Sequence, residues 1–344
     1  PATEARFQID PSTKIGTIGS CFAQNIAQHL VKQGFSYFVT EEGPPWLSAE
    51  EKRSHGYGVF SARYGNVYNT LQLLQVLDRS TGQYNPDEKV WPFQNGYADP
   101  FRPYIEPSGF SSESELLEDR KTHLNAVRTL FHDVDVLIVT LGLTESWVSN
   151  ITGTAFPLCP GCGAGQFDQS VHEFKNFGFS DVTGHLNEFI TRFHDINPDG
   201  KILFTVSPVP LVATYEPHHV LQSTVYSKSV LRAAVEDLKK SWSFVDYFPS
   251  FEIITWTLNN PSYYQPNKRS VSDIGVTHVM KCFFEAYTEH HFEADLNSSS
   301  SAVEPVSGTV KIEGVDADTS ITDDDVVCDE ERVLDHLSNH ERQR

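Results

Sequence analysis

The sequence predicts an α/β protein with three layers (α/β/α), in which helices cover both faces of an open, mostly parallel sheet. Short apolar runs rich in β-branched residues alternate along the chain with longer stretches that repeat apolar residues every three or four positions. Small, polar or turn-forming residues directly follow four of the apolar runs. This order of elements is typical of buried parallel strands joined by crossover helices.

Five short runs have the composition of buried strands. The first covers residues 15–18, and residues 134–140 (VDVLIVT) are the clearest of the set. Polar or turn residues bound each run, as expected for strands that are covered on both faces. The other three are residues 35–39, 201–206 and 243–247.

Helical periodicity separates these runs. Phe22, Ile26 and Leu30 recur every four positions, so a helix over residues 22–30 would have one apolar face. Comparable patterns predict helices over residues 111–131, 182–195 and 226–240.

Residues suited to chemistry follow four of the predicted strands: 19–23 (GSCFA), 141–147 (LGLTESW), 207–210 (SPVP) and 248–252 (FPSFE). Ordinary loop composition would explain any one of these segments alone. Because the carboxyl ends of parallel strands meet at one edge of a sheet, four such segments together favour a site at that edge.

The turn in residues 15–23 (IGTIGSCFA) carries the sharpest functional signal. The β-branched run stops at Gly19, and a helical pattern begins directly after Ser20 and Cys21. Backbone N–H groups and the dipole at a helix N-terminus stabilise negative charge, so they lower a cysteine pKa and can hold an oxyanion. The alternative is that Cys21 is a small buried residue packed at a strand end.

Composition restricts the classes of partner. No apolar run approaches the roughly 20 residues of a membrane helix, and the N-terminal residues lack the pattern of a secretory signal. The formal charge of −20 argues against nucleic acid or an anionic membrane as partner. Five scattered cysteines do not suggest a disulfide framework, so we expect a reducing, cytoplasmic setting. No residue spacing indicates a metal site.

Half of the charge excess lies in the last 52 residues. Residues 293–344 hold fourteen acidic and four basic side chains, a net of −10, together with a serine-rich stretch. This composition predicts an acidic, largely solvated extension with one helix over residues 329–340. Docking of the extension on the main domain is the alternative. The predicted catalytic domain is then residues 1–292.

The motif at residues 19–23, GSCFA, is the signature of the GSCFA domain family, which the chain resembles over residues 7–292. Matching blocks are residues 62–68, 140–145, 205–211, 247–250 and 275–280. The family is thought to be related to the SGNH (GDSL-type) esterases and acyltransferases, which have a flavodoxin-like fold. The resemblance therefore implies a flavodoxin-like sheet and an acyl-enzyme that is hydrolysed or passed to an acceptor hydroxyl, with a carbohydrate or polysaccharide precursor as substrate.

The resemblance also implies roles for individual residues. Aligning Gly19 with the first glycine of the SGNH motif makes Cys21 the nucleophile, and a shift of one residue makes Ser20 the nucleophile instead. The oxyanion would be held by the backbone N–H of Cys21 and by three further residues, Gly65, Asn66 and Thr144.

His278 is the implied base, and its alternative is a buried histidine on an apolar helix. Asp273 is the implied orienting acid, although it precedes His278 by five residues where the family relative has three. Glu145 and the region of Ser207 are alternatives for that role.

Five residues are candidates for substrate contact, because aromatic and charged side chains suit sugar rings and anionic acyl carriers: Arg63, Tyr68, Arg102, Glu145 and Trp147. No cofactor is expected, and an acyl-CoA could serve as co-substrate. The competing class is a non-catalytic module of the same fold that binds an acyl carrier or a glycan. The sequence leaves the oligomeric state open.

Overall fold

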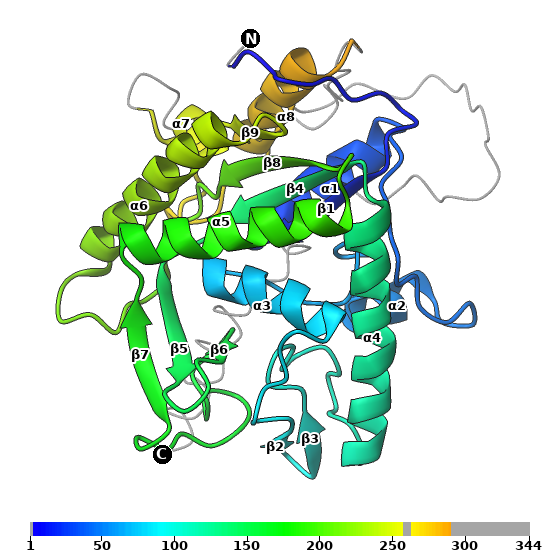
Figure 1. The fold of residues 1–344 in the computed structure, drawn as a ribbon, viewed down its shortest axis with the longest axis vertical. Coiled ribbons are helices and arrows are strands. Elements are labelled where there is room, and N and C mark those ends of the chain that lie inside the picture. Colours follow the sequence, from blue (N-terminus) through cyan, green and yellow to red (C-terminus); the bar gives the residue numbers. More distant parts are fainter. Residues whose placement is uncertain (1–2, 257–262, 290–344) are drawn as a thin grey trace, which may run out of the picture.

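The computed structural model describes residues 3–256 and 263–289 (Figure 1). At its centre is a parallel four-stranded sheet with the order β1 (Ile15–Gly19), β4 (Val136–Leu141), β8 (Lys201–Val206) and β9 (Val245–Phe248). A parallel bridge between Ile15 and Tyr37 extends the sheet beyond β1. The resulting order is that of the flavodoxin-like folds. The predicted open parallel sheet is therefore confirmed.

Four of the five predicted strands are confirmed, and the segment at residues 35–39 forms a single bridge instead of a strand. Around Tyr37 the segment does bond to β1, since Ile15 N–H donates to the Ser36 carbonyl at 3.0 Å and Phe38 N–H donates to the Ile15 carbonyl at 2.8 Å. Other backbone groups in and beside the segment bond elsewhere. Tyr37 N–H donates to the Phe35 carbonyl at 2.9 Å, and Thr40 N–H donates to the Ser61 carbonyl at 2.8 Å. A continuous ladder with β1 is thereby excluded.

Alternate residues of the strands face two separate apolar cores. Along β4, Leu137, Val139 and Leu141 face one core, and Val136 and Ile138 face the other. This is the period of two expected for a strand that is covered on both faces.

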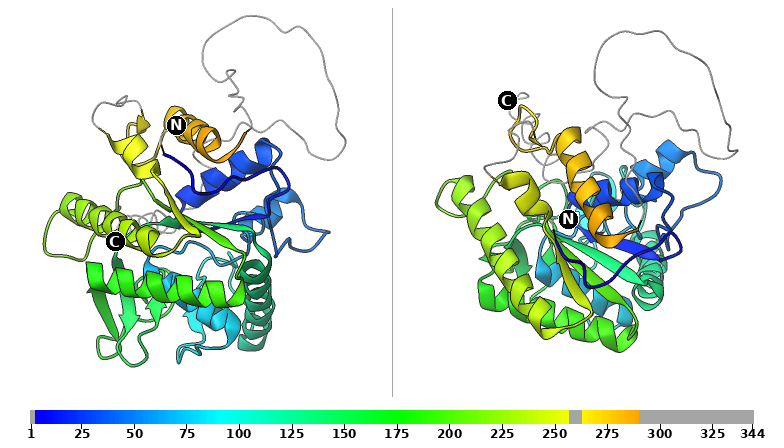
Figure 2. Two further views of the ribbon diagram at one scale, coloured as in Figure 1. Left: turned by 45° about the horizontal axis from the view of Figure 1, so that its top comes forward. Right: turned by 90° about the horizontal axis from the view of Figure 1, so that it is seen from above.

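Helices complete the three layers, as predicted. Figure 2 shows α1 and α8 on one side of the sheet and α5 on the other. The first core is covered by α3 (Thr70–Thr81), α4 (Glu113–Asp133), α5 (Phe179–Ile196) and α6 (Val220–Ser241). The second is covered by α1 (Phe22–Lys32), α7 (Ser250–Thr255) and α8 (Asp273–Tyr287). The four predicted helices correspond to α1, α4, α5 and α6.

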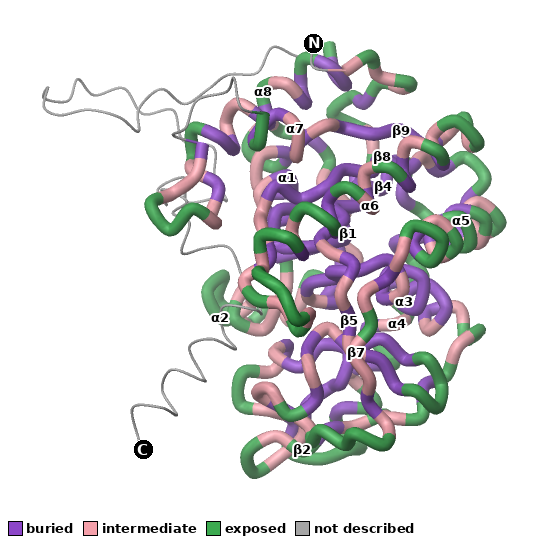
Figure 3. Tube along the Cα trace, turned by 90° about the vertical axis from the view of Figure 1, so that its left-hand side faces the viewer, coloured by how far each residue is buried: buried purple, intermediate pink, exposed green. Residues whose placement is uncertain are grey.

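Two small antiparallel sheets, which the sequence did not predict, lie beyond α3 in the lower half of Figure 1. One contains β5 (Glu145–Ser149), β6 (Ala155–Phe156) and β7 (His172–Asn176), and the other pairs β2 (Trp91–Phe93) with β3 (Gly96–Ala98). Val148 and Ala155 belong to the same core cluster as the residues under α3 to α6. Figure 3 shows buried residues concentrated in the central strands and continuing around β5. A short surface helix, α2 (Ala49–Ser54), completes the described elements.

The predicted extension at residues 293–344, with its helix at 329–340, lies outside the described residues. The division into residues 1–292 and 293–344 therefore stays a prediction. Within residues 3–256 and 263–289, no helix combines the length and the apolar character needed to cross a membrane.

Gly19→Ala is expected to destabilise the fold by roughly 3 kcal/mol. Gly19 has φ +142°, and a Cβ atom there would overlap the Thr140 carbonyl oxygen of the neighbouring strand. The matched control is Gly184→Ala on the exposed face of α5, where an added Cβ atom meets nothing within 4 Å. This substitution should raise the free energy of unfolding by about 0.5–1 kcal/mol, because alanine favours a helix over glycine. Urea unfolding of both variants measures the difference, and a wild-type midpoint for Gly19→Ala would contradict the constraint.

Candidate active site

A small cavity lies at the carboxyl ends of three parallel strands and encloses about 260 Å³ of space, part of it open to solvent. Ser20 and Cys21 follow β1, and Gly142 and Leu143 follow β4. Three of the four predicted strand ends therefore meet in one place. The remaining lining residues are Tyr68, Ser207, Val209, Pro210, Leu211, Lys228 and Arg269.

The fourth strand end, after β9, does not line this cavity. Helix α7 begins there at once with Ser250. The Ser250 hydroxyl donates to the Val206 carbonyl at 2.9 Å and lies 2.5 Å from Thr205 Oγ1, so the segment is tied to the end of β8.

Both candidate nucleophiles line the cavity. Ser20 is 3% exposed and Cys21 is 6% exposed. Ser20 N–H donates to the Thr140 carbonyl at 3.0 Å, and Ser20 Oγ has no hydrogen-bond partner among the described residues. Cys21 occupies the N-cap position of the eleven-residue helix α1. The thiol thus lies at the end of the helix where the backbone N–H groups favour negative charge.

The opposite wall of the cavity packs closely against this turn. A Cβ atom on Gly142 would lie 2.9 Å from the Tyr68 carbonyl oxygen and 3.2 Å from Ser20 Cβ. The Tyr68 carbonyl accepts the N–H groups of Gly142 and Leu143 at 3.1 and 3.0 Å. These two amides are therefore engaged in holding the wall together. Tyr68, predicted to contact substrate, does line the cavity.

Two cationic side chains that the sequence analysis did not single out also line the cavity, Lys228 and Arg269. Lys228 is 2% exposed, and its Nζ donates to the Gly142 carbonyl at 2.5 Å. None of the described residues that line the cavity is acidic. The helical register of α6 could have indicated that Lys228 is buried. Position 228 falls on the same helix face as the buried residues Leu231, Val235 and Leu238.

Gly65 and Asn66 lie next to a residue that bonds to the turn, but they do not line the cavity at Cys21. Val67 N–H donates to the Gly19 carbonyl at 2.8 Å, which holds this segment against the end of β1. Both residues line a neighbouring pocket, open to solvent and enclosing about 530 Å³, together with aromatic residues such as Phe60 and Tyr104. Their roles as oxyanion donors stay predictions.

Thr144 and Glu145 are held by buried or half-buried partners outside the cavity. Thr144 Oγ1 donates to Asn176 Oδ1 at 2.6 Å and lies 2.8 Å from Ser227 Oγ. Glu145 Oε1 accepts from the Thr214 hydroxyl at 2.6 Å. Neither residue is among the described residues that line the cavity with Cys21, and their predicted roles stay predictions.

Trp147 lies on β5 in an aromatic cluster instead of at the cavity. Its ring contacts three others edge-on, with centroid distances of 4.9 to 5.8 Å: Phe167, Phe174 and Tyr215. Contact of this cluster with a substrate stays a prediction.

His278 and Asp273 lie on α8, and neither lines the cavity. His278 is half-buried, and its Nδ1 lies 2.5 Å from the Tyr263 hydroxyl. Asp273 is exposed at the first turn of the helix. Five residues along a helix correspond to a rotation of roughly 140°, so the two side chains leave α8 on different faces. Their roles as base and orienting acid stay predictions of the resemblance.

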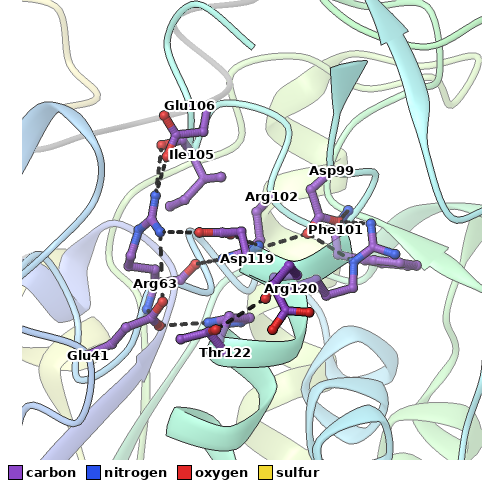
Figure 4. Close-up of polar contacts among 12 residues, drawn as sticks. Glu41, Arg63, Asp99, Phe101, Arg102, Ile105, Glu106, Asp119, Arg120 and Thr122 are labelled. Carbon is purple, nitrogen blue, oxygen red and sulfur yellow. Dashed lines mark hydrogen bonds and ion pairs between the residues drawn. The ribbon is translucent and has the colours of Figure 1, made fainter. Parts of the chain in front are cut away.

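The two arginines predicted to contact substrate are part of a buried network of charges (Figure 4). Arg63 is 1% exposed and bonds to Asp119 at 2.8 Å and to Glu106 at 2.6 Å. Arg102 bonds to Asp99 at 3.0 Å and to Asp119 at 2.6 Å. Arg63 also lies 3.9 Å from Glu41, so each guanidinium is engaged by at least two carboxylates. The network ties the segment at residues 99–106 to α4, although Arg102 also lines the larger pocket.

A buried histidine and glutamate extend the same network. His123 Nδ1 lies 2.8 Å from Glu41 Oε2. Burial lowers the pKa of His123 to about 4, and the charge of Arg102 adds to that effect. Burial alone would raise the pKa of Glu41, but His123, Arg102 and the Arg63 N–H outweigh it and lower that pKa to about 2. A neutral imidazole therefore donates to a carboxylate at neutral pH.

The free energy of unfolding is expected to fall as pH drops from about 6.5 to about 4. Unfolded His123 takes up a proton near its ordinary pKa of 6.5, whereas the native residue stays neutral down to about 4. The unfolded state therefore binds more protons in this window, and the difference corresponds to about 3 kcal/mol.

Urea unfolding of the wild type and of His123→Gln at pH 7.5, 6.0 and 5.0 measures this effect. Burial also lowers the pKa of His29 and His185, so the informative quantity is the difference between the two proteins. We expect a shallower pH dependence in His123→Gln. Equal slopes would contradict the assignment.

The comparisons with known proteins agree with the sequence motif. A model of the GSCFA family matches residues 14–283. Among curated proteins, no sequence matches the chain. Similar solved structures include a family 3 carbohydrate esterase from Clostridium thermocellum, with 10% identity, a TM-score of 0.34, and coverage of 80% of this chain and 94% of that one.

An acetyl xylan esterase from the rumen bacterium Butyrivibrio proteoclasticus is also similar, with 11% identity, a TM-score of 0.27, and coverage of 70% of this chain and 56% of that one. Similarity at this level carries no conclusion about activity. The family match, in contrast, spans most of the chain and includes the turn at Ser20 and Cys21. The chain belongs to the GSCFA family.

Proposed function

We propose that the chain is an esterase or acyltransferase that forms an acyl-enzyme on Cys21. The observation that carries the proposal is the position of the thiol. Cys21 lies at the N-terminus of α1, at the carboxyl end of β1, in a cavity where the charged residues of the described lining are both cations. A helix N-terminus and neighbouring cations favour a thiolate, which is the nucleophilic form of cysteine.

The proposed reaction begins with attack of the Cys21 sulfur on the carbonyl carbon of an ester or thioester. The backbone N–H groups at the start of α1 hold the negative oxygen of the tetrahedral intermediate. Loss of the alcohol or thiol leaves a thioester on Cys21. Attack by water then completes hydrolysis, and attack by an acceptor hydroxyl completes transfer. The two outcomes share one intermediate.

Electrostatics favour Cys21 over Ser20 as the nucleophile. A serine hydroxyl needs an adjacent general base, usually a histidine, to become reactive. The described lining of the cavity contains no histidine and no carboxylate. A thiol with an ordinary pKa of about 8.5 is brought to the thiolate by positive charge alone.

The substrate class rests on the family resemblance. We propose a carbohydrate or polysaccharide precursor as the molecule that gains or loses the acyl group, with an acyl-CoA as donor if the reaction is a transfer. The resemblance assigns proton transfer to His278. That role stays a prediction, because His278 does not line the cavity.

A non-catalytic module is the second candidate function. The absence of His278 and Asp273 from the lining of the cavity favours it, because esterases of the SGNH type use such residues. In that case the cationic cavity would bind an acyl carrier or a glycan without turning it over.

Incubation with p-nitrophenyl acetate or acetyl-CoA, followed by intact mass spectrometry, is expected to show an adduct of about 42 Da on the wild type. Cys21→Ala should abolish the adduct, whereas Ser20→Ala should keep it. Cys282→Ala is the matched control, because it removes a different cysteine, which is half-buried on α8.

Each result has a defined meaning. An adduct lost only in Ser20→Ala would make Ser20 the nucleophile. Loss of turnover with retention of the adduct in His278→Ala would place that residue in deacylation. A wild-type protein that forms no adduct and turns over neither donor would overturn the proposal in favour of the binding module.

A further inference from the structure

Lys228 is a cation buried in the wall of the nucleophile cavity. Its side chain is 2% exposed and is among the largest fully buried side chains of the described residues. Burial of an ammonium group costs several kcal/mol unless hydrogen bonds and charge compensate it. A lysine on the apolar face of α6 therefore costs folding free energy that a leucine or methionine at the same position would not cost.

The surroundings hold the ammonium group close to the turn at residues 20–21. Nζ donates to the Gly142 carbonyl at 2.5 Å, and Gly142 itself packs against Ser20. The preceding residue, Ser227, bonds through Oγ to Thr144 Oγ1 at 2.8 Å and to Thr144 N–H at 3.3 Å. These bonds fix α6 against the segment that follows β4, so Lys228 has a defined position at the cavity.

The charged and titratable groups that line the cavity with Cys21 are Tyr68, Lys228 and Arg269. A guanidinium does not release its proton in proteins, so Arg269 supplies fixed positive charge. A lysine can both stabilise an anion and, when desolvated, exchange a proton. Lys228 is thus the group in this lining best suited to a proton-carrying role beside a thiol.

We infer that Lys228 is a catalytic residue that pairs with Cys21 as thiolate and ammonium and carries the proton through acyl transfer. The chemical part of this inference rests on the proposed function. The pairing itself can be tested without a substrate.

Cys21 and Lys228 together account for every proton that moves in the proposed cycle. The Cys21 thiolate attacks the acyl carbonyl, a C–S bond forms, and the C–O bond to the leaving alcohol breaks. The Lys228 ammonium gives its proton to the leaving alkoxide and becomes an amine. The amine then takes a proton from water or an acceptor hydroxyl as that oxygen attacks the thioester. Cleavage of the C–S bond restores thiolate and ammonium.

The test measures the rate of Cys21 alkylation by iodoacetamide against pH in the wild type, Lys228→Met and Lys228→Arg, with the labelled peptide identified by mass spectrometry. In the wild type we expect half-maximal labelling at least about one pH unit below that of a free thiol. Lys228→Met should label about ten-fold more slowly at pH 7 and reach the wild-type rate at high pH.

Lys228→Arg separates charge from proton transfer. Arginine keeps the positive charge, so the low labelling midpoint should persist, but it cannot pass the proton, so acyl turnover should fall by about 100-fold or more. Lys240→Met, at an exposed position on the same helix, is the matched control and should label like the wild type. Circular dichroism checks that each variant folds. If Lys228→Met does not fold, Lys228→Arg still tests the proton-carrying role.

The outcomes separate this inference from the proposed function. Equal labelling midpoints in the wild type and in a folded Lys228→Met would overturn the pairing even if an acyl-enzyme forms on Cys21. A shifted midpoint with no acyl-enzyme in the wild type would support the pairing and overturn the proposed function. Full turnover in Lys228→Arg would overturn the proton-carrying role.

Discussion

The end of β1 lies so close to the end of β4 that no side chain fits between them, and the candidate site depends on this approach. A Cβ atom on Gly19 would lie 2.8 Å from both the nitrogen and the carbonyl carbon of Thr140. Ser20 N–H donates to the same Thr140 carbonyl. The chain must therefore leave the sheet sharply and start α1 with Cys21 as its N-cap. A backbone contact thus determines where the thiol lies.

A second constraint keeps carboxylates away from the thiol. Asp99, Glu106 and Asp119 are bound by arginines, and Glu41 is bound by His123. None of these four carboxylates lines the cavity at Cys21. Buried charges of opposite sign satisfy one another there, and removal of one partner would leave the other uncompensated. Among the described residues, the lining of the cavity at Cys21 includes two cations and no acidic residue. The separation of charge within one domain favours an anion at the cavity.

The parts of the fold that local patterns encode could be predicted from the sequence. The periods of β1, β4 and β8, and of α1, α4 and α5, are visible in the chain, and so is the sharp stop at Gly19. Helix α3 was missed even though Asn69 and Gln72 form a capping box at its start. Strand β7 was missed because it pairs with β5 through residues more than twenty positions apart, such as Glu145 and Asn176. Strand β6 has two residues only, Ala155 and Phe156, too few for a visible alternation.

The site was predictable mainly at strand ends, because topology dictates the position of a strand end. Tyr68, which follows no strand, was predicted from the family resemblance and its aromatic side chain, and it lines the cavity. Arg63 was predicted to contact substrate, but it binds Asp119 on α4, which lies 56 positions away in the sequence. No local sequence pattern predicts that ion pair. Lys228 was missed because a single lysine in a helix usually faces solvent. It reaches the cavity through the packing of α6 against residues 142–144. Once the described lining is known, its charge supports the proposal of Cys21 as the nucleophile. Positive charge alone favours a thiolate, whereas a serine hydroxyl needs a base, and no described residue of the lining supplies one.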